Sequence, residues 1–154
     1  MSRRDIDLAM QLIAERLPGL RQPRRIDAAA FARHRRVLGQ YRWVTDCIRL
    51  NARYLDDLDD LRALDLLDTL LHELLHRNSR PLRQLRDSFR PHPDIWCEAG
   101  RLCEALGDEF LARRRGAQRG EMHAKSTPGL LQNPLPKRLP EADPISDPKS
   151  RRHP

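Results

Sequence analysis

Two histidines and a glutamate at positions 72, 73 and 76 have the spacing with the clearest chemical meaning in this chain. His72 and His76 are four residues apart, so on a helix their imidazoles project from one face and can hold a single Zn²⁺. Glu73 lies between them, where its carboxylate can reach a water molecule on such an ion and act as general base. The motif predicts a zinc-dependent hydrolytic site, provided that the segment is helical and a third ligand exists.

The residues around this motif predict a helix that is buried on most of its circumference. On a wheel of about 100° per residue, the leucines from Leu61 to Leu75 cover more than half of the circle, interrupted by Asp68. The remaining arc carries Asp65, Thr69, His72, Glu73 and His76. The alternative is an amphipathic core helix whose histidines face solvent, but a solvated arc more often carries lysine, arginine and glutamate. The composition of this arc favours the metal site.

A catalytic zinc site needs a third protein ligand, and two downstream residues are candidates. His92 lies sixteen residues after His76, and Pro93 next to it restricts its backbone to extended conformations. Glu98 lies twenty-two residues after His76 but inside a predicted helix, where a surface charge or a hydrogen bond to a ligand imidazole is an equal explanation. His92 is the better candidate because it lies at the start of the last predicted helix, beside a turn. Glu98 stays open as the alternative.

Hydrophobic periodicity predicts the elements that position these residues. Apolar residues recur at helical spacing from Asp5 to Leu17, and again in a last helix that opens at Pro91 and extends to Arg113. Aromatic and β-branched residues in Gln40–Asn51 predict one bent strand or a tight strand pair, with Gly39 in a turn before it. Ala28–Arg36 fits a short helix or an irregular connection equally well. These elements predict an α+β fold with a small sheet beside the motif helix.

An acidic cluster precedes the motif helix and is expected to cap it. It consists of Asp56, Asp57, Asp59 and Asp60. Carboxylates at this position accept hydrogen bonds from unpaired backbone N–H groups and favour the positive end of the helix dipole. A calcium-binding loop is the sharper alternative, but the cluster lacks the glycine and the terminal glutamate that such a loop requires.

Composition limits the class of protein and its organisation. The 154 residues carry a net charge of +7, which makes a nucleic acid or another anionic partner plausible. The chain has no apolar run long enough for a membrane span and no signal-peptide core, so the expected location is cytoplasmic. We predict one domain over residues 1–115 and a disordered, proline-rich tail over residues 116–154. Cys47, Cys97 and Cys103 form no CxxC pair and are expected to be reduced, partly buried thiols.

Five arginines lie between the second and the third proposed ligand. They are Arg77, Arg80, Arg83, Arg86 and Arg90, and the last three are spaced as on a short helix with a basic face. A solvated surface is the ordinary explanation for such a run. The functional alternative is a basic rim that binds DNA or another nucleic acid beside the metal. Such a rim would select substrate proteins that are bound to the nucleic acid. The affinity for nucleic acid should then fall steeply as the salt concentration rises.

Several of these segments together resemble the SprT-like zinc metallopeptidases, the family of Spartan-type proteases, over roughly residues 5–110. The matching segments are Leu38-Gly39-Gln40-Tyr41, Cys47-Ile48-Arg49-Leu50-Asn51, Leu67 to His76, and His92 followed four residues later by Trp96. The resemblance implies a zincin-like fold, with a small sheet packed on the HExxH helix and flanking helices. It also implies zinc held by His72, His76 and His92, with Glu73 as catalytic base. Pro93 stands where the family usually has glycine, and the CxxC pairs of its C-terminal zinc ribbon are missing.

The implied function is hydrolysis of peptide bonds in protein or peptide substrates by a metal-activated water. The group that stabilises the oxyanion is left open among Tyr41, Tyr54 and an arginine. A second class of function is also open: a non-catalytic, metal-binding or nucleic-acid-associated accessory module on a peptidase scaffold. Zinc content, and self-cleavage that disappears with a chelator, would distinguish the two classes.

Overall fold

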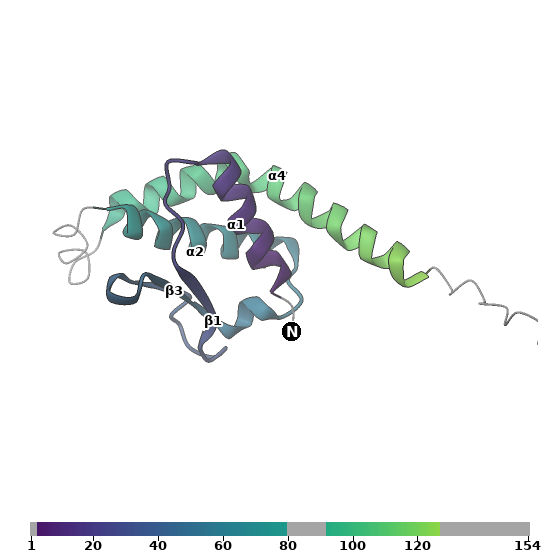
Figure 1. The fold of residues 1–154 in the computed structure, drawn as a ribbon, viewed down its shortest axis with the longest axis horizontal. Helices are drawn as coiled ribbons and strands as arrows, with labels where there is room; N and C mark the ends of the chain where they lie inside the picture. The colour runs from purple at the N-terminus through teal and green to yellow at the C-terminus, as the bar shows by residue number, and fades with distance from the viewer. Residues whose placement is uncertain (1–2, 80–91, 127–154) are drawn as a thin grey trace, which may run out of the picture.

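Three α-helices and a three-stranded sheet form the part of the chain that the computed structural model describes, residues 3–79 and 92–126 (Figure 1). In chain order they are α1 (Arg4–Arg16), β1 (Arg25–Phe31), β2 (Gly39–Arg42), β3 (Cys47–Asn51), α2 (Asp60–Asn78) and α4 (Pro93–Ser126). Short 3-10 helices at Trp43–Thr45 and Ala52–Leu55 follow β2 and β3. The fold class is therefore α+β, as the sequence predicts.

Helix α2 is the central element and contacts α1, α4, β2 and β3. It begins after Asp59, whose side chain accepts a hydrogen bond of 2.8 Å from the backbone N–H of Arg62. The predicted capping role of the acidic cluster is thus confirmed for Asp59. The leucine face of α2 is fully buried at Leu66, Leu67, Leu70, Leu71 and Leu74, whereas Leu61 is exposed. The apolar pattern of this segment therefore marks the helix around which the core forms.

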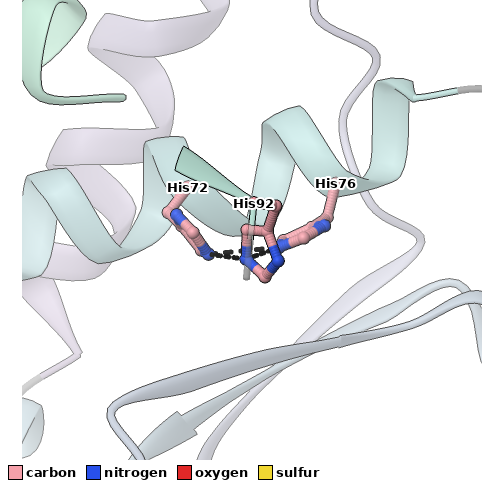
Figure 2. A group of neighbouring side chains, drawn as sticks. All are labelled: His72, His76 and His92. Carbon is pink, nitrogen blue, oxygen red and sulfur yellow. Dashed lines mark hydrogen bonds between the residues drawn. The ribbon is translucent and has the colours of Figure 1, made fainter. Parts of the chain in front are cut away.

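The other two helices cover α2 through apolar stripes at helical spacing. Helix α1 buries Ile6, Ala9, Leu12 and Ile13, and α4 buries Ile95, Ala99, Leu102, Leu106 and Phe110. The start of α4 lies alongside α2 next to the two histidines of the motif (Figure 2). Helix α4 continues through Gly116 to Ser126, so the expected boundary between residues 115 and 116 falls inside this helix. The remainder of the predicted tail, residues 127–154, lies outside the described residues.

The sheet has the order β1-β3-β2, so β3 is central and β2 is an edge strand. Strands β2 and β3 are antiparallel, with Gly39 opposite Leu50 and Arg42 opposite Cys47. Of the two alternatives for Gln40–Asn51, one bent strand or a strand pair, the structure has the strand pair, which begins one residue earlier, at Gly39. Strand β1 pairs with β3 in parallel, and it occupies part of the segment for which the sequence left a helix or an irregular connection open. Gly39 opens β2, so its predicted position in a turn is wrong.

Two expectations from composition can be compared with the described residues. None of the helices in these ranges contains an apolar stretch long enough to cross a membrane. All three cysteines are free thiols, of which Cys47 is buried and Cys103 is half-buried. Cys97 is exposed, so the expectation of partial burial is wrong for this residue.

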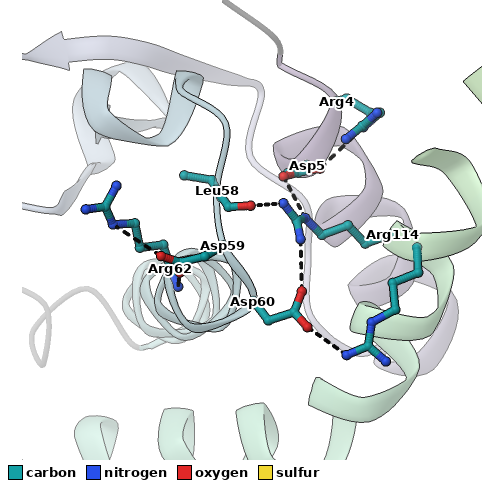
Figure 3. Close-up of polar contacts among 8 residues, drawn as sticks. Arg4, Asp5, Leu58, Asp59, Asp60, Arg62 and Arg114 are labelled. Carbon is teal, nitrogen blue, oxygen red and sulfur yellow. Dashed lines mark hydrogen bonds and ion pairs between the residues drawn. The ribbon is translucent and has the colours of Figure 1, made fainter. Parts of the chain in front are cut away.

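A buried arginine on α4 joins this helix to α1 and to the start of α2 (Figure 3). Arg114 is 4% exposed and donates hydrogen bonds of 3.0 Å to both Asp5 and Asp60, and a further one to the carbonyl of Leu58. Asp5, itself buried, also forms an ion pair with Arg4 at 3.4 Å. The guanidinium therefore neutralises a carboxylate inside the core, where an unpaired charge would be costly.

Replacing Arg114 by alanine is expected to lower the free energy of unfolding by about 3 kcal/mol, because a buried charge and a buried carbonyl lose their partner. Denaturant unfolding measures this change. Arg115→Ala is the matched control: its exposed guanidinium also contacts Asp60, at 2.6 Å, and a solvated ion pair contributes little to stability. Equal losses of stability in the two variants would contradict this role of Arg114.

Candidate metal centre

The two histidines of the motif lie on the side of α2 that faces the start of α4. They are separated by one helical turn, which places both imidazoles on one face. His92 directly precedes α4, and its backbone carbonyl accepts hydrogen bonds from the N–H groups of Ile95 and Trp96, at 3.1 and 3.4 Å. These bonds to the first turn of α4 fix the backbone of His92 and hold its side chain over α2.

The Nε2 atoms of the three imidazoles converge on one point (Figure 2). They are separated by 3.1 Å between His72 and His76, 3.0 Å between His76 and His92, and 3.4 Å between His72 and His92. Three nitrogens that bind one zinc ion tetrahedrally at about 2.0–2.1 Å are about 3.3 Å apart. The spacing of the nitrogens therefore fits a single ion. Among the side chains that the structure describes, this is the one group of three or more potential metal ligands.

Burial of His72 favours the neutral form of its imidazole. Burial, together with smaller effects of the neighbouring His76 and His92, lowers the pKa of His72 to about 4. A neutral imidazole presents a lone pair at its unprotonated nitrogen and can bind a metal ion. The Nε2 atoms of the three histidines are directed at one another, and a cation between them would accept a lone pair from each. The donor set thus fits a divalent ion such as Zn²⁺.

Glu73 lies on the neighbouring face of α2 and is directed toward β2. Its Oε2 accepts a hydrogen bond of 2.6 Å from the backbone N–H of Tyr41, and the residue is only 6% exposed. Burial raises the pKa of Glu73 to about 7, while the bond from Tyr41 acts in the opposite direction. A carboxylate with a pKa near neutrality, held by one backbone donor beside the imidazoles, has the properties of a general base.

The buried carboxyl of Glu73 makes the stability of the metal-free protein depend on pH. Between about pH 4.5 and 7 the folded state retains a proton that the unfolded state has released, so this contribution to stability falls as pH rises. His72 acts oppositely between about pH 4 and 6.5, because the unfolded chain takes up a proton that the folded one does not. The two contributions offset each other in the parent protein.

Glu73→Gln removes the pH-dependent contribution of Glu73 to stability, so the difference between the variant and the parent measures that contribution. We expect the metal-free variant to be more stable than the parent at pH 8, by about 3 kcal/mol, with a difference that shrinks toward pH 4.5. Chemical denaturation of both proteins across this range, in the presence of a chelator, measures it. Glu104→Gln, at an exposed position of α4, serves as control. A stability difference that does not vary with pH would contradict the raised pKa.

Gly39 allows β2 to approach Glu73, a role that the sequence analysis missed. A Cβ atom at this position would lie 2.7 Å from Cγ2 of Thr69 and 3.0 Å from Cγ of Glu73. Any side chain would therefore push β2 away from α2 and lengthen the bond between Tyr41 and Glu73. The signal in the sequence was a glycine directly before a segment with strand character, because a glycine in a strand often marks a close backbone approach.

If Glu73 acts as a general base in hydrolysis, Gly39→Ala is expected to lower the rate by about 10²-fold while metal binding is retained, because displacements near 1 Å at a catalytic group have effects of this size. Hydrolysis rates and zinc content of the purified variant measure the two quantities. Gly100→Ala is the matched control, since a Cβ atom there would meet nothing within 4 Å. Unchanged catalysis in Gly39→Ala would show that the approach of β2 is not needed.

A cleft of about 510 Å³ opens over these groups. Its lining includes Thr69, the three histidines and Glu73, and on the β2 side residues 36–41 and Trp43. Asp65 and Asp68 lie one to two turns before His72 on α2, and Trp96 contributes from α4. The edge strand, the proposed base and the imidazoles thus face one space that a peptide segment could enter.

Glu98, the alternative third ligand, is directed elsewhere. Its carboxylate accepts hydrogen bonds of 2.7 and 3.0 Å from Arg101 on the next turn of α4. The guanidinium of Arg101 also lowers the pKa of Glu98. The structure therefore brings His92 to the two motif histidines and leaves Glu98 in a surface ion pair.

Both tyrosines considered for the oxyanion have hydroxyl groups that are hydrogen-bonded to aspartates. Tyr54 is 1% exposed, and its hydroxyl lies 2.8 Å from Asp65 and 2.9 Å from Thr69 inside the core. Tyr41 lines the cleft, but its hydroxyl donates its one proton to Asp46 at 3.0 Å. An arginine was the third candidate, and among the described residues Arg36 lines the cleft.

Of the five arginines of the proposed basic rim, the structure describes Arg77 alone. Arg77 donates two hydrogen bonds to Asp46, at 2.7 and 2.9 Å, so its guanidinium ties α2 to the connection between β2 and β3. Arg80, Arg83, Arg86 and Arg90 lie outside the described residues, as does the predicted short helix around them. Nucleic-acid binding at these residues stays a prediction, which salt-dependent retention on DNA or RNA would test.

The site thus combines three converging imidazoles from two helices with a buried carboxylate that an edge strand holds in place. The histidines and Glu73 are those that the sequence indicated, whereas Gly39 and the backbone of Tyr41 emerge from the structure. Comparisons of the chain with protein-family models, with curated proteins and with solved structures found no match. Its function is therefore inferred from the geometry of this site.

Proposed function

We propose that this chain is a zinc-dependent metallopeptidase, with a zincin-like domain of the SprT-like type. The observation that carries the proposal is the convergence of three Nε2 atoms within 3.0–3.4 Å of one another beside the carboxylate of Glu73. An α+β fold in which an edge strand lies beside the helix that carries the HExxH motif supports it further. His72, His76 and His92 would hold the ion.

A bound zinc ion supplies Lewis acidity, which activates a water molecule at neutral pH and polarises a carbonyl group. Glu73 accepts the proton of the attacking water at its carboxylate and later transfers it to the leaving amine. The backbone N–H of Tyr41 orients the carboxylate for both transfers. Burial of Glu73 raises its pKa toward neutrality, so the group can exchange a proton near pH 7.

Strand β2 is the element best placed to position a substrate. It forms the edge of the sheet and lines the cleft next to Glu73. An extended peptide can add to such an edge through backbone hydrogen bonds, which align it without regard to its sequence. A peptide bond aligned in this way would cross the cleft between Glu73 and the three imidazoles.

Hydrolysis of an unfolded protein substrate by the full-length, metal-loaded chain tests the proposal. We expect cleavage that stops when a chelator removes the metal and returns when one equivalent of zinc is added. Equal activity in the chelated protein would contradict a metallopeptidase. Zinc binding without cleavage of any of a broad panel of unfolded proteins would instead favour the non-catalytic metal-binding module.

A further inference from the structure

Exposed large apolar side chains are concentrated at the cleft. Among the described residues, those with substantial exposure are Val37, Trp43, Val44, Leu61 and Trp96. Three of the five, Val37, Trp43 and Trp96, line the cleft, and they include both tryptophans of the chain. Scattered exposed apolar residues need no explanation, but a group that borders one concave site marks a binding surface.

Trp96 gives this surface a position relative to the proposed metal. It lies one helical turn after His92 on α4, and its ring centroid is 4.6 Å from that of His72, at an interplanar angle of 52°. The side chain therefore packs against a proposed ligand, yet the residue remains 61% exposed. An aromatic surface beside the metal-binding nitrogens can contact only the part of a substrate that flanks the reacting bond.

The opposite wall is held in place by hydrogen bonds. Val37, which is 47% exposed, lies in a segment whose carbonyls at Arg35 and Val37 accept bonds of 3.1 and 3.0 Å from the buried amide of Asn51. Trp43, which is 69% exposed, begins the 3-10 helix that ends next to Asp46. Asp46 in turn is bonded to Tyr41 and to α2, as described above. Both apolar groups are thus presented from anchored backbone, which lowers the entropy cost of binding.

We propose that the cleft selects substrates with a large apolar side chain, aromatic or aliphatic, next to the cleaved bond, and that Trp96 is the main determinant of this specificity. The inference rests on the proposed peptidase function and names its substrate class. Side chains of this kind are mostly buried in folded proteins. The natural substrates would therefore be unfolded or extended segments of protein rather than the surfaces of folded domains.

Two aspartates in the cleft provide an alternative hypothesis, a preference for basic substrate residues. Asp65 and Asp68 also line it, on the α2 side. Asp65 is paired with Arg53 at 2.9 Å, and burial together with the nearby Asp65 raises the pKa of Asp68. A preference set by these carboxylates would favour lysine or arginine in the substrate, and a peptide series distinguishes it from the apolar preference.

The test uses one peptide sequence with phenylalanine, leucine, alanine, lysine or aspartate at the position next to the cleaved bond. We expect kcat/KM for the phenylalanine and leucine peptides to exceed that for alanine by about tenfold, a typical effect of apolar packing in a specificity pocket. Trp96→Ala should bring this ratio close to one, and Trp96→Phe should retain much of it. Leu61→Ala, at an exposed apolar position outside the cleft, should leave the ratio unchanged.

Binding of the same labelled peptides to zinc-loaded Glu73→Gln, followed by fluorescence anisotropy, separates this inference from the peptidase proposal. The inference is supported if Glu73→Gln binds the phenylalanine peptide more tightly than the alanine peptide and if the Glu73→Gln/Trp96→Ala double variant loses this difference. This outcome supports the inference even if the parent cleaves nothing. Cleavage or binding without preference, or with preference for lysine, overturns it while leaving the peptidase intact. Zinc content of Trp96→Ala must match the parent, since loss of metal would assign Trp96 a purely structural role and also overturn the inference.

Discussion

Glu73→Gln is expected to reduce peptide hydrolysis by about 10²–10⁴-fold, the usual contribution of a positioned general base. The amide has nearly the same shape and can still accept the hydrogen bond from Tyr41, so the approach of β2 is preserved. It cannot accept a proton from water, which removes the chemical step while leaving the three imidazoles untouched. Single-turnover rates of cleavage by zinc-loaded protein measure the loss, and metal analysis establishes that the ion is retained.

The control for this variant is Glu104→Gln, the same change at an exposed site on α4. It should leave the rate unchanged. The same Glu73→Gln substitution should also stabilise the metal-free protein above pH 7, because it removes a buried ionisable group. Lower activity together with higher stability is the signature of a residue retained for chemistry rather than for folding. A Glu73→Gln protein as active as the parent would rule out Glu73 as the base.

His92→Ala is expected to weaken zinc binding by more than about 100-fold, since even groups that only support a ligand contribute 10–100-fold. Two histidines one turn apart on α2 would remain, and they leave the coordination of the ion incomplete. Peptide hydrolysis should disappear at zinc concentrations that saturate the parent. Competition with a chromophoric chelator measures the affinity of each variant.

Glu98→Ala is the matched control for the third ligand, because it tests the alternative that the sequence left open. Its carboxylate is paired with Arg101 on the surface of α4, so removing it should leave zinc affinity unchanged. Thermal unfolding of His92→Ala without metal should stay close to that of the metal-free parent, since the backbone carbonyl that bonds to the first turn of α4 remains. Weaker zinc binding in Glu98→Ala but not in His92→Ala would contradict the proposed ligand set.

The sequence predicted best those features that depend on local geometry. The i, i+4 spacing of His72 and His76 places them on one face of any helix, and the leucine pattern made a helix the clear expectation. The helices α1 and α4 and the strand pair β2–β3 followed from the same periodicities. The structure also brings His92, and not Glu98, to the two motif histidines, and Pro93 places the histidine just before a helix.

The features that the sequence left open or missed depend on contacts between distant residues. Strand β1 has three consecutive alanines, which favour helix, and it becomes a strand through its pairing with β3. The bond between Tyr41 and Glu73 spans 32 positions, and that between Asp5 and Arg114 spans 109, so no local pattern encodes them. Helix α4 passes through Gly116 and Gly120 because a glycine costs only about 1 kcal/mol in a helix.

Metal analysis of the tag-free, full-length protein, loaded with zinc and then dialysed against metal-free buffer, tests the ligand set most directly. If the imidazoles of His72, His76 and His92 hold a single ion, the parent retains one zinc per chain, and alanine at any of these three positions abolishes retention. A parent that retains no zinc, or three variants that retain as much as the parent, would contradict the metal centre and with it the proposed peptidase.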